Sequence, residues 1–280
     1  TNTHRALVED AAAAGVAIYC EKPLAPDLAA VEAMQRAVDA AGVPHQVGLV
    51  LRQSAPFTAV AELLAGGPGP RGRVMAATLR DDQYFPNQGQ YGSAWRADVH
   101  QAGGGTLIEH SIHDLDLLSW ILGPVVTVSC RTANYAGFAG VEDVAVATLT
   151  HESGATSSLV SVWHQVLSRP STRRLEVFCE QSLLWVDDEV AGPVHELAGD
   201  LPAEHDTPPL GPDLAGFVAR DEWRVALSGY AAAARAFCAA ISAGRPPAPG
   251  FEVAVTAHRV ADAAYRSAAS GGLPVEVALL

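Results

Sequence analysis

The sequence predicts a two-part fold, in which a piece of an α/β domain is followed by an α+β domain with a large, mostly antiparallel sheet. Three patterns predict it. Strand and helix alternate over the first 51 residues, strand-like runs rich in Val, Leu and Thr follow between residues 125 and 187, and two long helical stretches close the chain. Because 49% of the 280 residues are apolar, the chain can bury a sizeable core.

The first part of the chain has the spacing of a strand–helix–strand unit. A helix over residues 4–14 precedes a short apolar strand over residues 16–20. A second helix begins after Asp27 and ends at Gly42, and residues 44–51 form the next strand. Such a unit predicts parallel strands joined by a right-handed crossover.

After residue 72 the pattern changes to that of an antiparallel sheet with helices. Short loops that carry Gly or Pro separate the strand-like runs. We expect strands over 73–80, 125–132, 142–151, 155–164, 174–180, 182–187 and near 274–277, helices over 106–122, 222–243 and 251–270, and a loop over 191–212. We place the domain boundary at the end of the second strand, so that residues 1–54 form one domain and residues 55–280 the other.

The charge balance excludes several classes of partner. Lys and Arg number 18 while Asp and Glu number 31, so the formal net charge is −13. Phosphate backbones and anionic membranes attract proteins with a net positive charge, so we expect neither nucleic acid nor a membrane as a partner.

The four cysteines are widely spaced and form no Cys-x-x-Cys pair, which favours reduced thiols in a cytoplasmic protein.

The first candidate for chemistry is the segment Cys20-Glu21-Lys22-Pro23, which follows the strand over residues 16–20. In open α/β sheets, ligands bind just beyond the carboxyl ends of the strands. A lysine at such a place can hold a hydroxyl group, and the proline limits its conformations. A solvated Glu-Lys pair at a strand end is an equally reasonable interpretation of these residues on position alone.

The second candidate begins with three glycines, Gly103 to Gly105, and leads into a helix. Glu109 and His113 are four residues apart and would share a face of that helix. A carboxylate beside a histidine is suited to acid–base work near neutral pH. The alternatives are an amphipathic helix with an incidental histidine and, less favoured, a metal site that includes His110. Because the His-Glu-x-x-His order is absent, we expect no metal.

Taken together, these motifs resemble those of the glucose–fructose oxidoreductase/inositol dehydrogenase/MocA (Gfo/Idh/MocA) family. The resemblance rests on Asn-x-His at the start, Glu-Lys-Pro after the first strand, a Trp-Arg segment, and the glycine run followed by an acid, His113 and Asp116. It covers essentially the whole chain. It implies a Rossmann-type cofactor domain, of which residues 1–54 would be the C-terminal half, and a substrate-binding and oligomerisation domain with a large sheet.

The resemblance also implies an activity, namely NAD- or NADP-dependent hydride transfer to or from a sugar, cyclitol or small polyol. Lys22, Glu109 and His113 would be catalytic, with His113 as the general acid/base and Glu109 where the family most often has Asp. The remaining residues that it assigns are cofactor-binding Asn2, His4, Glu21, Lys22, Pro23 and Arg52, and substrate-binding Trp95, Arg96, Glu109 and His113.

One departure from the family pattern limits these expectations. The Gly-x-Gly-x-x-Gly turn between a first strand and a helix is absent near the start, and Gly66 to Gly69 are a poor substitute. We therefore expect an N-terminally truncated member that is inactive alone. The alternative is an inactive homologue that acts as a binding or oligomerisation module. In either case the sheet needs cover on one face, so we expect a homodimer or homotetramer.

Overall fold

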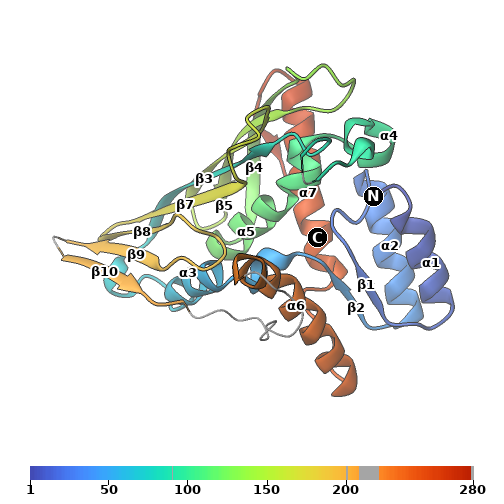
Figure 1. Cartoon of the computed structure of the whole chain (residues 1–280). Coiled ribbons are helices and arrows are strands. Elements are labelled where there is room, and N and C mark those ends of the chain that lie inside the picture. The colour runs from blue at the N-terminus through green and yellow to red at the C-terminus, as the bar shows by residue number, and fades with distance from the viewer. Residues whose placement is uncertain (90, 200, 208–220, 279–280) are drawn as a thin grey trace.

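The computed structural model describes residues 1–89, 91–199, 201–207 and 221–278, except that it leaves the side chains of residues 221–226 and 228 undescribed. Within these residues the chain forms two sheets with helices around them (Figure 1). No helix in this part of the chain is long and apolar enough to cross a membrane. The two-part prediction is therefore confirmed at the level of fold class.

The N-terminal unit contains two helices and a two-stranded parallel sheet. Its elements are α1 (His4–Ala13), β1 (Ile18–Cys20), α2 (Leu28–Ala41) and β2 (His45–Val47). Asp27 caps α2 by accepting a hydrogen bond from the Ala30 amide, and Gly42 ends it in the left-handed conformation, as predicted. Buried side chains of α2, among them Val31 and Met34, pack into the core of this unit.

The predicted strand over residues 44–51 is wrong beyond Val47. The chain leaves the sheet there and forms a 3₁₀ turn, η1 (Val50–Gln53), which leads into α3 (Ala55–Ala65) and a second 3₁₀ turn, η2 (Gly69–Arg71). A short buried apolar run fits a strand or a helical turn equally well, so its periodicity does not separate the two.

The described residues form a nine-stranded sheet in the order β10-β9-β8-β7-β3-β6-β5-β4-β11. The central strand β3 runs parallel to β6, and every other pair is antiparallel. The strands are β3 (Val74–Tyr84), β4 (Val125–Ala133), β5 (Val144–His151), β6 (Thr156–His164), β7 (Thr172–Cys179), β8 (Ser182–Val186), β9 (Val194–Ala198), β10 (Leu201–His205) and β11 (Val275–Glu276). Side chains alternate between a buried and a more exposed face along β5, β6 and β7.

The loop predicted over residues 191–212 is wrong for its first part, because β9 and β10 lie within it. The Pro-rich, acidic composition hides these strands, and pairing with β8 overrides the weak local preference. Residues 208–212 lie outside the described residues.

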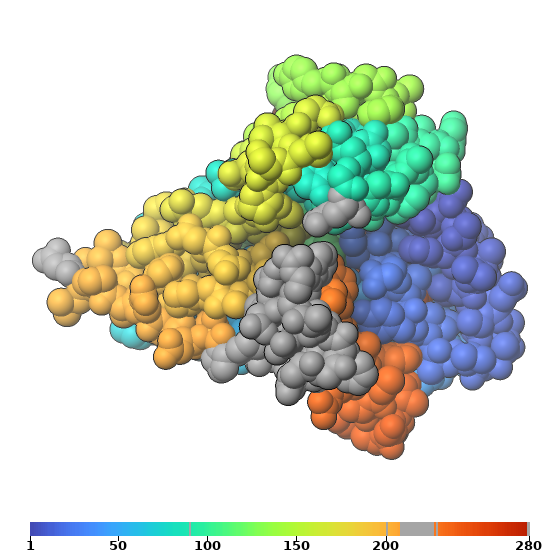
Figure 2. All heavy atoms as spheres, viewed as in Figure 1, coloured from blue at the N-terminus to red at the C-terminus, as the bar shows by residue number. Residues whose placement is uncertain are grey.

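Helices cover one face of the large sheet, and the N-terminal unit packs against one of them (Figure 1). Figure 2 shows this unit, in blue, at one side of the molecule. The remaining elements are η3 (Ala94–Ala97), α4 (Val99–Ala102), η4 (Thr106–His110), α5 (Ile112–Leu122), α6 (Asp221–Ser242) and α7 (Phe251–Ala269). The helix predicted over residues 106–122 is divided, because η4 is a π-helical turn and α5 begins only at Ile112. One helix, α7, contributes buried side chains to the cores of both units.

Candidate active site

Lys22 lies just beyond the carboxyl end of β1, and its side chain crosses to the η4 turn. Its ammonium group donates a hydrogen bond to the Glu109 carbonyl oxygen at 2.6 Å. It also lies 3.7 Å from the Glu109 carboxylate, and the lysine side chain is only 16% exposed. The Lys22–Pro23 peptide bond is cis. The lysine and the glutamate that the sequence singled out therefore meet at one place.

Glu109 is a buried carboxylate, 2% exposed, that lies between two cations. One of its oxygens accepts a hydrogen bond from Arg96 Nε at 2.9 Å and lies near Lys22. Burial alone would raise the pKa of Glu109, but Lys22 and Arg96 together outweigh burial and lower that pKa to about 2. Glu109 is therefore ionised throughout the neutral range.

Arg96 is held in place from three sides. Its guanidinium lies over the ring of Trp95 at 4.6 Å, and its Nη1 donates to Ser93 Oγ at 2.7 Å, in addition to the contact with Glu109. The Trp-Arg segment over η3 thus reaches the same site as Lys22.

His113 lies in the first turn of α5 and is 5% exposed. Its Nδ1 is buried and has no hydrogen-bond partner in the described part of the chain. Burial, followed by the positive charges of Lys22 and Arg173, holds the pKa of His113 well below its usual value, so the ring is neutral at pH 7. A buried ring nitrogen without a partner is one that a bound ligand can satisfy.

The glutamate does not orient this histidine. Among the described residues, the Glu109 carboxylate contacts Arg96 and Lys22, and no hydrogen bond joins it to His113. The π-helical turn separates the two residues, so the four-residue spacing does not place them on a common α-helical face.

Glu142 holds the glycine run in place, and no sequence pattern pointed to this residue. Its carboxylate accepts hydrogen bonds from the Gly105 and Leu107 amides at 2.8 and 2.9 Å and from the Tyr265 hydroxyl at 2.8 Å. A Cβ on Gly105 would overlap the Glu142 carbonyl oxygen. The glycine is therefore needed for close packing here, and the carboxylate satisfies amides at the start of η4.

The other residues that the resemblance assigned to cofactor binding surround the Lys22 segment. His4 Nδ1 lies 3.0 Å from the Pro23 carbonyl oxygen and so braces the segment after the lysine. The Glu21 carboxylate lies over Gly48, where a Cβ would stand 2.8 Å from Glu21 Oε2. Asn2 donates its backbone N–H to the Gln101 carbonyl oxygen at 3.3 Å.

Arg52 is committed to a bidentate ion pair. Its Nε and Nη2 donate to the two Asp116 carboxylate oxygens at 2.9 and 2.7 Å, and its guanidinium lies over the Trp120 ring at 5.1 Å. This clamp joins η1, which follows the N-terminal unit, to α5 of the large domain. Arg52 therefore supports the helix that carries His113.

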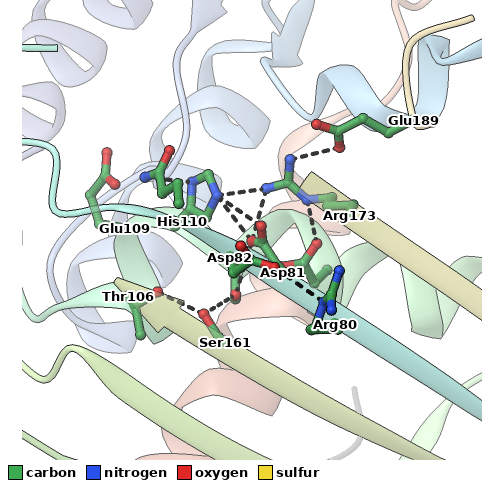
Figure 3. Close-up of polar contacts among 12 residues, drawn as sticks. Arg80, Asp81, Asp82, Thr106, Glu109, His110, Ser161, Arg173 and Glu189 are labelled. Atoms are coloured by element: carbon green, nitrogen blue, oxygen red, sulfur yellow. Dashed lines mark hydrogen bonds and ion pairs between the residues drawn. The ribbon is translucent and has the colours of Figure 1, made fainter. Parts of the chain in front are cut away.

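A second buried polar cluster lies behind the π turn, and the sequence did not single it out (Figure 3). Arg173 on β7 binds Asp81 of β3 and Asp114 of α5, and His110 of the turn joins Asp81. The only local signal was that two acids follow the predicted strand over residues 73–80. In the described residues no group of three or more His, Cys, Asp or Glu side chains is arranged to hold a metal ion.

Two family models match the chain. The model described as "Oxidoreductase family, NAD-binding Rossmann fold" matches residues 1–49, and that described as "GFO/IDH/MocA C-terminal domain" matches residues 57–184. The chain belongs to the Gfo/Idh/MocA family. The resemblance seen in the motifs is thereby confirmed.

Relatives of this Gfo/Idh/MocA protein include sugar and cyclitol dehydrogenases. It is 37% identical over 158 residues to a D-apiose dehydrogenase from Paraburkholderia graminis, a match that covers 55% of this chain and 40% of the relative. It is 28% identical over 278 residues to an inositol 2-dehydrogenase from Rhizobium meliloti, covering 96% and 76% of the two chains. The chain thus spans less than half of the first relative.

Solved structures of the family share the fold of this Gfo/Idh/MocA protein. The aldose-aldose oxidoreductase from Caulobacter crescentus superposes with a TM-score of 0.80 at 27% identity, and the match covers 98% of this chain and 77% of that structure. The architecture of both units therefore agrees with that of a solved family member.

Proposed function

We propose that this protein transfers a hydride between a nicotinamide cofactor, NAD or NADP, and a hydroxyl or carbonyl group of a sugar, cyclitol or similar small polyol. The observation that carries the proposal is the contact between Lys22 and Glu109 beyond the carboxyl end of β1, with the buried ring of His113 near enough for the charge of Lys22 to lower its pKa. The names of the relatives, which include apiose and inositol dehydrogenases, support the substrate class.

The residues around Lys22 fit the nicotinamide end of such a cofactor. The buried Nδ1 of His113 lacks a partner, and a hydroxyl group of a ligand would supply one. The Lys22 ammonium has three N–H donors, of which one reaches the Glu109 carbonyl, so donors remain for a hydroxyl of the ribose or the substrate. The residues that we propose to line or brace the cofactor side are Asn2, His4, Glu21, Pro23 and Arg52.

The cofactor, when bound, supplies the hydride acceptor or donor. The chain's own residues orient the substrate and handle its proton. Because its ring is neutral, His113 accepts the proton of the substrate hydroxyl. Lys22 donates a hydrogen bond to the same substrate oxygen, and Glu109 holds Lys22 and Arg96 at the site through its negative charge. Trp95 and Arg96 cover the substrate.

The finer organisation is also a proposal. Residues 1–54 would form the cofactor side and residues 55–280 the substrate and assembly side, which the separate cores of the two sheets support. The large sheet would pair with a second copy of this chain in a homodimer or homotetramer. A cytoplasmic location is supported by the four free cysteines, three of which are buried.

Titration with NADH and NADPH, followed by nicotinamide fluorescence, tests the cofactor half of the proposal. Turnover of a panel that includes myo-inositol and D-apiose tests the substrate half. Both assays would use the 280-residue chain and a form extended ahead of Thr1 by the residues of the Rhizobium meliloti relative that precede the matched region. We expect the extended form to bind a cofactor and to oxidise at least one polyol.

Failure of a folded extended form to bind either cofactor would overturn the proposal. That result would favour a binding or oligomerisation module instead. Circular dichroism of the extended form, compared with that of the 280-residue chain, separates loss of binding from loss of folding.

A further inference from the structure

Three carboxylates share one guanidinium in the buried cluster behind the π turn (Figure 3). Arg173 donates through Nη2 to Asp81 at 3.0 Å, through Nε to Asp114 at 2.7 Å and through Nη1 to Glu189 at 2.8 Å. Asp81 and Asp114 are both fully buried, whereas the Glu189 side chain is 17% exposed. One arginine cannot neutralise two buried carboxylates and a third at its outer edge, so the cluster needs a further proton.

The hydrogen-bond donors show which carboxyl group carries that proton. Asp81 faces donors at both oxygens, since the Nε2 of His110 lies 3.0 Å from Oδ1, and Arg173 and Ser111 reach Oδ2. Asp114 accepts at Oδ1 from Arg173, and its buried Oδ2 has no hydrogen-bond partner in the described residues. The Asp81 carboxyl group lies within hydrogen-bonding reach of the Asp114 carboxyl group. A proton on Asp114 Oδ2 would satisfy both groups, because it would donate to Asp81.

The electrostatics agree with this placement. Burial raises the pKa of Asp114 to about 7, against the opposing charge of Arg173 and with the help of the neighbouring Asp81. His110 also faces the pair, as Arg173 and Glu189 do, and burial together with the charges of Arg173 and Lys22 lowers the pKa of His110 to about 3. The ring is therefore neutral. Its Nδ1 lies 3.4 Å from the Gln83 amide nitrogen, and its Nε2 lies 3.0 Å from Asp81 and 3.2 Å from Arg173 Nη2. In the tautomer whose Nδ1 accepts from Gln83, the Nε2–H donates to Asp81.

The cluster holds both ends of the turn that carries the candidate catalytic groups. His110 is the last residue of η4 and follows Glu109 directly, while Asp114 follows His113 in the first turn of α5. The hydroxyl of Ser111 lies 2.6 Å from that of Ser161, which lies 2.6 Å from that of Thr106 at the start of the turn. Any rearrangement around Asp81 would therefore displace Glu109 or His113.

We propose that Asp114 holds a proton that it donates to Asp81, and that this pair, with Arg173, positions Glu109 and His113 for the reaction. The positioning role rests on the proposed function, whereas the location of the proton does not. Asp81, Asp114 and Arg173 are positioning residues, because in the described part of the chain no hydrogen bond or ion pair joins any of them to Lys22 or Glu109.

A matched pair of variants tests the proposal. In Asp114→Asn the amide keeps an oxygen for Arg173 and donates an N–H to Asp81, as the protonated acid does. In Asp81→Asn a single oxygen must replace two that accept from His110 and Arg173. We expect kcat of Asp81→Asn to fall roughly 10- to 100-fold, and kcat of Asp114→Asn to fall several-fold less than that.

The pH profile distinguishes positioning from a merely structural role. In the extended parent protein, kcat should fall above about pH 7 as Asp114 loses its proton. The pH profile of Asp114→Asn should lack this fall.

The pH dependence of the unfolding free energy gives a second test. Because the folded pKa is above the ordinary value, stability should fall as pH rises from about 4 to about 7 and then level off, and Asp114→Asn should lack this slope.

Infrared spectroscopy provides a readout that needs neither turnover nor the second variant. At pH 6 the difference spectrum of the 280-residue parent minus Asp114→Asn should contain the C=O band of a protonated carboxyl group, because other carboxyl groups with a raised pKa, such as that of Glu142, are common to both proteins. Absence of that band from the difference spectrum would overturn the proton's location. Equal losses of kcat in the two variants, with both proteins folded, would overturn the positioning role.

Discussion

At the scale of single residues, His113 combines burial with a ring nitrogen that has no hydrogen-bond partner in the described residues. We expect His113→Ala in the extended form to reduce kcat by roughly 10²- to 10⁴-fold, because the substrate hydroxyl loses its proton acceptor. Cofactor affinity, measured by NADH fluorescence, should remain nearly unchanged. The exposed His100→Ala is the matched control. An unchanged kcat in His113→Ala would remove this residue from the proposed mechanism.

Glu109 should contribute to stability in a pH-dependent manner. Its folded pKa of about 2 is below the ordinary value of 4.5, so its contribution is present above pH 4.5 and is lost as pH falls toward 2. The shift corresponds to about 3 kcal/mol of unfolding free energy. Denaturant titrations between pH 2 and pH 6 should show this loss in the parent and not in Glu109→Gln.

The matched control for Glu109 is Glu62→Gln, which alters an exposed carboxylate on α3. That variant should follow the parent over the whole pH range. The same slope in Glu109→Gln as in the parent would show that Lys22 and Arg96 do not stabilise the Glu109 charge.

Sequence reasoning predicted the site residues that belong to compact local motifs and missed those that only the fold brings together. Lys22, Glu109 and His113 lie in two short segments with a recognisable order of residue types. Glu142 lies just before β5 and Arg173 lies on β7, both far along the chain, and no spacing connects them to the glycine run. Their roles arise from the register of the large sheet, which a single sequence does not specify.

At the scale of elements, the glycine run shows how the π turn is held. Gly105→Ala should lower the unfolding free energy by about 1–3 kcal/mol or more, since its Cβ would collide with the Glu142 backbone. Gly66→Ala is the control, because its φ is −74° and a Cβ there has no neighbour within 4 Å. Thermal or denaturant unfolding would measure both, and equal stabilities would contradict the packing described for η4.

The elements themselves were predictable to different degrees. Helices with caps and apolar periodicity, such as α2, were predicted closely, and so were the alternating strands β4 to β8. The π geometry of η4 was not predicted, because the apolar pattern of residues 106–122 fits an uninterrupted α-helix as well. The hairpin of β9 and β10 was hidden by its composition, since an edge hairpin owes its structure to pairing more than to propensity.

At the scale of the whole molecule, the uncovered face of the large sheet carries an apolar row. Phe178, Leu183 and Leu197 are cross-strand partners on β7, β8 and β9, and Phe178 and Leu197 are 37% and 40% exposed. If this face pairs with a second copy, Phe178→Glu should weaken the assembly roughly tenfold or more. Light scattering over a concentration series would measure it.

Tyr135→Glu is the matched control for that experiment, because Tyr135 is an aromatic residue that is 84% exposed outside the strands of the row. It should leave the assembly unchanged. A parent protein that is monomeric at all concentrations would contradict the proposed pairing.

The position of α7 has a consequence for how the protein loses its structure. Its first turns, with Phe251 and Val255, complete the core of the N-terminal unit, and its later turns, with Val260 and Ala264, complete the core under the large sheet. Neither core can release this helix without exposing the other. The two units therefore melt as one cooperative body, and a proteolytic cut ahead of α7 would destabilise both at once.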